Sequence, residues 1–288
     1  MSVLDALYGA VDDDTRTFDC CDTTFEVHAE GFRAARGVAA ATRVARDLER
    51  QLNAFDPDSD VAALAREGTV TNEHVAALVR RAREYEDRTN GVFTVRHGRT
   101  ERAVKTYIRE GGSVPEADGD AATVSVDGDV VTASRPLDLN GIAKGYLVDR
   151  AHEALAAPGR RGYVNGGGDI AGPTGGAVAI ESPWGGDPLR VLDTDWAVAT
   201  SGEYRRRRGG VDHIYRATAD GVAVGAENTL VTVVARRDCT EADVLATTCA
   251  ALHPDDARAL IADWPGAEAF LVHDGVFHET EGFDAHLA

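Results

Sequence analysis

The chain is short of lysine, and this shortage limits the partners it can have. Lys105 and Lys144 are the only lysines in 288 residues, so the other 28 of the 30 basic residues are arginine. Against 48 acidic residues, the formal net charge is -18. Such a surface repels nucleic acid and anionic membranes, and we expect neither as a partner. It is typical of proteins from a high-salt cytoplasm, which predicts a halophilic protein; an ordinary acidic protein is the alternative.

The chain also lacks cysteine pairs with metal-binding spacing and long apolar runs. The four cysteines form no C-x-x-C pair and lie near no histidine cluster, so their spacing does not indicate a zinc site. They are Cys20, Cys21, Cys239 and Cys249. We expect reduced thiols, because adjacent cysteines make a poor disulfide. No run approaches the ~18 apolar residues that span a bilayer. Residues 1–14 show no secretory signal or lipid-anchor cysteine, and we expect a cytoplasmic protein.

The order of the expected elements indicates an α+β fold. A hydrophobic content of 43% in 288 residues is ample for a buried core. Helices and strands are mixed without regular βαβ alternation, which favours one domain with a mixed, largely antiparallel sheet. Residues 1–17 are poorly patterned, and the domain is expected over 18–288. The patterns predict helices over 32–52, 74–88, 143–156, 240–252 and 255–263, with strands at 23–29, 178–181, 190–192, 197–200 and 229–235.

Turn and capping residues place the boundaries of these elements. Asp58 or Ser59, Thr71 and Thr240 are expected to cap the helices that follow them. Asn90-Gly91 is a helix stop signal. Hairpins are expected with turns at Asp127-Gly128 and Asp274-Gly275. Residues 96–119 are weakly patterned, and only a short helix over 103–108 is expected there.

Two glycine-containing turns suit an anionic ligand. Asp138 to Gly145 reads D-L-N-G-I-A-K-G and leads into a helix N-terminus, where backbone N–H groups and the positively charged Lys144 favour a phosphate or diphosphate. Asn165 to Asp169 reads N-G-G-G-D, which permits close approach of the backbone to a ligand. The alternatives are an ordinary strand-to-helix turn and a plain loop.

Two further groups carry possible chemistry. Asp243 and Thr247 are four residues apart on one helix face, and their hard oxygens suit Mg²⁺. The alternative is a capping box from Thr240 to Asp243. His213 has a side chain suited to a general base; the alternative, which nine histidines in the chain favour, is a structural histidine. The four arginines over 205–208 are expected to lie on the surface.

Taken in order, these segments resemble the ApbE family, the FAD:protein FMN transferases. The most specific is D-L-N-G-I-A-K-G-Y-L-V-D from Asp138, followed by N-G-G-G-D-I, A-T-S-G-E-Y and A-D-V-L-A-T. F-D-P-D-S from Phe55 and T-N-G-V-F from Thr89 are similar to N-terminal segments of the family. The resemblance covers about residues 18–280.

The resemblance implies a single domain of the T-fold type that binds FAD and Mg²⁺. Such an enzyme moves FMN from FAD to a Thr or Ser hydroxyl of an acceptor protein and releases AMP. By position, Asp243, Thr247 and the carbonyl of Gly141 are the implied metal ligands, and His213 the implied catalytic base. The implied FAD contacts are Asp138, Lys144, Phe55, Val92, Phe93, Thr94, Cys21 and Tyr215.

The chain departs from the family pattern at three places. Cys21-Asp22-Thr23 replaces M-G-T, and Val92-Phe93-Thr94 replaces A-F-D. His213 is followed by Ile-Tyr-Arg-Ala where the family has Ile-Ile-Asp-Pro. Two alternatives therefore stay open beside the transferase. One is a protein that binds FAD without catalysis, and the other is a Mg²⁺-dependent FAD pyrophosphatase that yields FMN and AMP.

Overall fold

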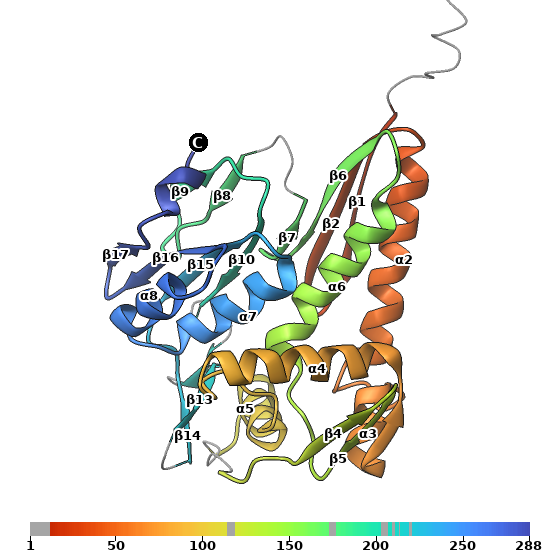
Figure 1. The fold of residues 1–288 in the computed structure, drawn as a ribbon, viewed down its shortest axis with the longest axis vertical. Coiled ribbons are helices and arrows are strands. Elements are labelled where there is room, and N and C mark those ends of the chain that lie inside the picture. The colour runs from red at the N-terminus through yellow and green to blue at the C-terminus, as the bar shows by residue number, and fades with distance from the viewer. Residues whose placement is uncertain are drawn as a thin grey trace, which may run out of the picture.

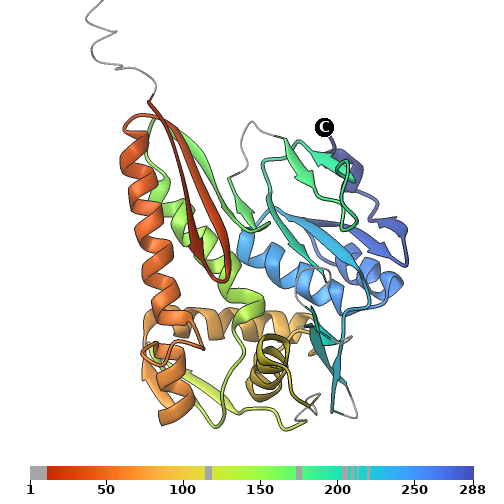
Figure 2. The same cartoon turned by 180° about the vertical axis from the view of Figure 1, so that it is seen from behind.

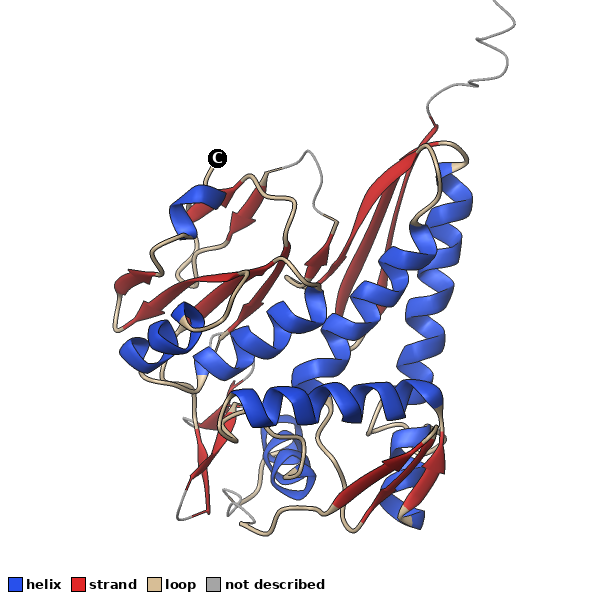
Figure 3. Ribbon diagram, viewed as in Figure 1, coloured by secondary structure: helices blue, strands red, loops and turns tan. Residues whose placement is uncertain are grey.

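Strands and helices alternate irregularly along the chain, as the α+β prediction requires (Figure 3). The fold is described from a computed structural model over residues 12–113, 119–172, 177–202, 207–208, 211–212, 214–218 and 221–288. Within those residues, no helix is both long and apolar enough to cross a bilayer. The fold class expected from the sequence is confirmed.

The largest sheet among the described residues has eight strands, and each neighbour runs antiparallel to the next (Figure 1). In spatial order these strands are β1 (Asp12–Cys20), β2 (Thr23–Gly31), β6 (Arg160–Gly166), β7 (Ile170–Ala171), β10 (Ala197–Ser201), β15 (Leu230–Ala235), β16 (Ala267–His273) and β17 (Val276–Glu279). The sheet therefore joins strands from both ends of the chain.

Three helices pack against this sheet and against one another. They are α2 (Ala34–Leu52), α6 (Asn140–Leu155) and α7 (Cys239–Ala250), and α8 (Pro254–Ala262) continues the layer beside β16 (Figure 1). Figure 2 shows β1, β2 and β6 from the opposite side, with α6 behind them. Along α2, the buried residues Val38, Ala41, Ala45, Leu48 and Leu52 recur at helical spacing and form its inner face.

A smaller layer lies below the main sheet in Figure 1. It contains α3 (Asp60–Glu67), α4 (Glu73–Arg88), α5 (Gly98–Glu110) and a three-stranded sheet of β3 (Thr69–Thr71), β5 (Val130–Ala133) and β4 (Val124–Asp127). The remaining strands form two-stranded pairs: β8 (Val178–Ile180) with β9 (Arg190–Leu192), β11 (Arg207–Arg208) with β12 (Val211–Asp212), and β13 (Tyr215–Thr218) with β14 (Gly221–Val224).

Strand β15 explains how the core is built on both faces of the sheet. All six of its residues are buried. Val231 and Val233 belong to the large apolar cluster on the helical face, whereas Leu230 and Val234 belong to a second cluster with β8, β9 and the 3₁₀ helix η2 (Phe283–His286). Because side chains alternate between the faces of a strand, a continuous apolar run is expected where both faces are covered.

Several predicted boundaries are corrected by the structure. Asn72, rather than Thr71, caps α4, since its side chain accepts hydrogen bonds from His74 N and Val75 N. Asp238, rather than Thr240, caps α7. The turn between β4 and β5 lies at Gly128-Asp129, one residue later than expected. Of the two caps predicted for α3, Asp58 and Ser59, it is Ser59 whose hydroxyl accepts from Ala62 N at 3.0 Å.

Candidate functional site

A cavity of about 280 Å³ lies where the start of α6 meets α5, α7 and β10. We call it the main cavity. Eight of the residues predicted to bind metal or FAD line it: Val92, Phe93, Thr94, Asp138, Gly141, Lys144, Asp243 and Thr247. They come from segments up to about 150 positions apart in the sequence, so the fold gathers the predicted site in one place.

A second cavity of about 140 Å³ extends from the first. We call it the side cavity. It shares Asp22, Lys105, Asn140 and Lys144 with the main cavity, and the predicted FAD contacts Cys21 and Phe55 line it. Arg109 lies over the Phe55 ring, 4.4 Å from its centroid. The two neighbouring cavities thus combine the cationic side chains of Lys105, Lys144 and Arg109 with several carboxylates, and an aromatic ring lines the side cavity.

The turn before α6 combines a local structural role with the predicted ligand role. Asp138 Oδ1 accepts a hydrogen bond from Asn140 N at 2.9 Å, so this carboxylate does hold its own turn. Leu139 occupies the N-cap of α6, and its side chain caps no N–H group. The Asp138 carboxylate therefore already satisfies the first N–H group of α6, while Asn140 and Gly141 of the first turn line the main cavity beside it.

Lys144 is held in the cavity by a buried acid. Its ammonium pairs with Asp169, whose side chain has no exposed surface. Burial alone would lower the pKa of Lys144, but the charges of Asp169 and Asp243 outweigh it and raise that pKa to about 12. Burial and the charge of Asp243 raise the pKa of Asp169, and Lys144 opposes this shift. Lys144 is therefore a fixed positive charge.

The glycine-rich loop between β6 and β7 serves mainly to present Asp169. Gly167 and Gly168 have φ values of 69° and 105°, which side chains rarely tolerate. A Cβ on Gly167 would lie 2.3 Å from Thr23 Oγ1. Only Gly167 of this loop lines the main cavity. The loop acts on the cavity largely through the pair of Asp169 with Lys144.

Asp243 and Thr247 face the start of α6 across a close helix contact. Asp243 Oδ2 accepts a hydrogen bond from Gly145 N at 2.9 Å. A Cβ on Gly145 would lie 2.6 Å from Cys239 O, so only glycine permits this approach of α6 to α7. A Cβ on Gly141 would lie 3.3 Å from Thr247 Cγ2, which places the Gly141 backbone against that side chain.

The capping alternative for Asp243 is wrong. Thr240 N donates to Asp149 Oδ2 at 2.8 Å and Cys239 N donates to Asp149 Oδ1 at 2.9 Å, so a residue of α6 satisfies the first turn of α7. Burial raises the pKa of Asp149 to about 6. Asp243, Thr247 and Gly141 all line the main cavity, and they carry a carboxylate, a hydroxyl and a backbone carbonyl. Such hard oxygen donors fit Mg²⁺.

Sequence reasoning missed a buried acid in this cavity. Glu101, on α5, is only 4% exposed and lines the main cavity. Its Oε1 accepts from Asn140 Nδ2 at 2.8 Å and pairs with Lys105 Nζ at 2.8 Å. Burial, and then the charge of Asp138, raises the pKa of Glu101 to about 7. The rarity of lysine was the one signal in the sequence that could have pointed to Glu101, because both lysines of the chain line this cavity and Lys105 pairs with Glu101.

The segment with the predicted base borders the same cavity. His213 lies outside the described residues, and only the backbone of Tyr215 is described, at the start of β13. Ile214, between them, is 3% exposed and lines the main cavity. The roles of His213 and Tyr215 stay predictions.

Comparison with known proteins identifies the family. Residues 21–271 match the ApbE family, and the chain belongs to it. A Treponema pallidum protein named FAD:protein FMN transferase is 29% identical over 284 residues, which covers 83% of this chain and 78% of that protein.

Solved structures show the same fold. The ApbE protein of Thermotoga maritima superposes with a TM-score of 0.79 at 20% identity, over 96% of this chain and all of that one (100%). The flavin transferase ApbE of Vibrio cholerae gives a TM-score of 0.77 at 19% identity, with coverages of 96% and 100%.

Proposed function

We propose that this chain is a Mg²⁺-dependent FAD:protein FMN transferase. It would move FMN from FAD to a Thr or Ser hydroxyl of an acceptor protein and release AMP. The observation that carries the proposal is the convergence of hard oxygen donors from α6 and α7 with the fixed charge of Lys144 in one cavity. The name of the Treponema pallidum relative supports the same reaction.

The chemistry needs positioning and charge neutralisation more than covalent help from the protein. Lys144, which is held by Asp169 and lines the main cavity, would neutralise a diphosphate at the start of α6. Asp243, Thr247 and the Gly141 carbonyl would hold Mg²⁺, which would polarise the phosphoryl group under attack. Phe55, which lines the side cavity, is a proposed contact for a flat part of the nucleotide.

His213 is the proposed base for the acceptor hydroxyl. A general base contributes roughly 10²–10⁴-fold to such a reaction. The assignment rests on the position of His213 in the family pattern, and its neighbour Ile214 lines the main cavity. The acceptor hydroxyl would attack the FMN phosphorus, its proton would pass to the base, and AMP would leave.

A FAD pyrophosphatase is the second candidate, because the residues after His213 depart from the family pattern. Water would then take the place of the acceptor hydroxyl. The test is to incubate the protein with FAD, Mg²⁺, high salt and an acceptor carrying an S/T-G-A-T-like segment. Covalent flavin with AMP supports transfer, whereas free FMN with AMP supports hydrolysis. If neither product forms while FAD binds, both enzymatic functions are refuted and the binding protein remains.

The composition also bears on where the protein works. A net charge of -18 with two lysines leads us to propose a high-salt cytoplasm. The measurement is FAD turnover and thermal unfolding against KCl concentration. Equal stability in low and molar salt would contradict the proposal.

A further inference from the structure

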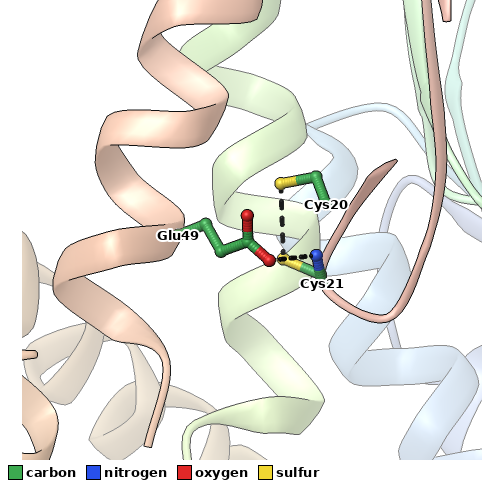
Figure 4. A group of neighbouring side chains, drawn as sticks. All are labelled: Cys20, Cys21 and Glu49. Carbon is green, nitrogen blue, oxygen red and sulfur yellow. Dashed lines mark hydrogen bonds between the residues drawn. The ribbon is translucent and has the colours of Figure 1, made fainter. Parts of the chain in front are cut away.

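Two thiols and a carboxylate lie close together at the end of the first hairpin, and none of them is among the residues proposed to bind Mg²⁺. Cys20 ends β1, Cys21 lies in the turn to β2, and Glu49 lies on α2; Figure 4 shows the three groups pointing toward one another. One donor atom from each residue lies within 4.8 Å of the other two. Glu49 Oε1 also accepts from Cys21 N at 2.6 Å, which ties the helix to the turn.

The hairpin backbone is bent in a way that brings the sulfurs together. Neighbouring residues of a strand point to opposite faces of the sheet, so adjacent cysteines normally diverge. Here Cys21 and Asp22 have φ values of 54° and 56°, in the left-handed region that costs a residue with a side chain about 1–2 kcal/mol. The result is a Cys20 Sγ to Cys21 Sγ distance of 3.8 Å.

This separation suits a metal better than a disulfide. A tetrahedral metal with metal–sulfur bonds of about 2.3 Å holds two sulfurs about 3.8 Å apart. A disulfide usually needs Cα atoms at least about 4.4 Å apart, whereas adjacent residues are fixed at about 3.8 Å. The donor set also selects the type of ion, since thiolates favour borderline or soft cations over Mg²⁺.

We propose that Cys20, Cys21 and Glu49 form a binding site for a thiophilic divalent cation of the Zn²⁺ class. Cys20 is buried, while Cys21 and Glu49 line the side cavity, so an ion held there has its remaining coordination position toward that cavity. Lys105, paired with Glu101, and Arg109, paired with Asp22, line the same cavity. The cysteine spacing alone gave no such indication, because the third donor lies 28 residues away from Cys21.

The test uses Co²⁺ as a probe, because its bonds to thiolate sulfur absorb in the near ultraviolet. The full chain is reduced with a phosphine, freed of metal and titrated with Co²⁺, and Zn²⁺ is then added. The expected result is one Co²⁺ per chain with a thiolate-to-cobalt band that Zn²⁺ abolishes. A folded protein that shows no band with excess Co²⁺ overturns the proposal.

Substitutions decide which groups bind. Cys20→Ala and Cys21→Ser should each abolish the band, and Glu49→Gln, which keeps an acceptor for Cys21 N, should weaken Co²⁺ binding at least about tenfold. Asp47→Asn, on the same helix but outside the cluster, and Cys249→Ala, a buried thiol of α7, should leave binding unchanged. Thermal unfolding reports whether each variant is folded; if Cys20→Ala does not fold, the partly exposed Cys21→Ser decides. A band that persists in Cys21→Ser overturns the proposal.

Discussion

Asp243 has two possible roles, and a pair of substitutions separates them. Its Oδ2 accepts from Gly145 N and so joins α7 to α6, and its carboxylate is a proposed Mg²⁺ ligand. Asp243→Ala removes both functions. Asp243→Asn removes the charge but keeps an oxygen that can accept from the same N–H group.

The structure sets the size of each effect. Asp243 is 3% exposed, so alanine leaves the buried N–H of Gly145 without its acceptor, at a cost of about 1–3 kcal/mol. At about 2–4 °C per kcal/mol for a domain of this size, Asp243→Ala should unfold about 2–12 °C lower than the wild type. Asp243→Asn should unfold closer to the wild type.

Activity should behave differently from stability. If Asp243 binds the metal, both variants lose Mg²⁺-dependent FAD turnover by at least about 100-fold, because an amide is a much poorer ligand than a carboxylate. The assay is AMP release against Mg²⁺ concentration, with the melting temperature of each variant measured in the same buffer. Both variants are assayed well below their melting temperatures.

A matched control removes a similar charge from the same helix. Asp238 caps α7, pairs with Arg81 and does not line either cavity. Asp238→Asn keeps a good capping residue and should leave turnover almost unchanged. If Asp243→Asn keeps wild-type turnover while Asp243→Ala loses it, the metal assignment is refuted, and the role of Asp243 is to hold the helices together.

Three further predictions concern the same cavity. Gly145→Ala should raise the Mg²⁺ concentration needed for turnover and lower stability by about 1–3 kcal/mol, because its Cβ would lie 2.6 Å from Cys239 O; an unchanged Mg²⁺ titration would contradict this. Lys144→Met should destabilise the fold by about 3–5 kcal/mol, because it leaves Asp169 buried without its partner. The double variant Lys144→Met, Asp169→Asn should recover stability in thermal unfolding, but it should not recover FAD affinity in a fluorescence titration. Restored affinity would mean that Lys144 does not contact FAD. The pKa of Glu101 is raised from 4.5 to about 7, so the folded state holds this proton more tightly than the unfolded state does, and the free energy of unfolding falls as pH rises from about 4.5 to 7. In Glu101→Gln, the free energy of unfolding should fall less between these pH values. A pH profile identical to that of the wild type would refute this contribution of Glu101.

Sequence patterns predicted helices and strands best where one face of the element is buried and the other is exposed. The apolar face of α2 predicted its end at Leu52, and residue type narrowed the cap of α3 to Asp58 or Ser59, of which Ser59 is the cap. Strand β1 was missed because it lies at the edge of the sheet and is mostly exposed, with only Phe18 and Cys20 buried. Charged residues that suit an edge strand hide the alternation that would reveal it. Helix α5 was underestimated because three of its four buried residues are Gly98, Thr100 and Glu101.

The site was predictable where motifs carry it and not where distant contacts decide it. The order of the motifs predicted that Asp138, Gly141, Lys144, Asp243 and Thr247 belong to one site, and all five line the main cavity. Local residue preferences could not choose between two acceptable caps for α7. The choice depends on Asp149, 91 residues before Thr240, which accepts hydrogen bonds from both the N–H group and the hydroxyl of Thr240 and so occupies that residue inside the first turn.

The placement of both lysines around the main cavity makes amine chemistry a selective probe of this protein. An acylating or reductively methylating reagent finds amines only at the N-terminus and at Lys105 and Lys144, since the other basic side chains are arginines and histidines. Peptide mass spectrometry can therefore read occupancy of the cavity directly, as protection of two side chains, with the N-terminal amine as the internal standard. Most proteins carry many surface lysines that would obscure such a measurement, and this chain carries none elsewhere.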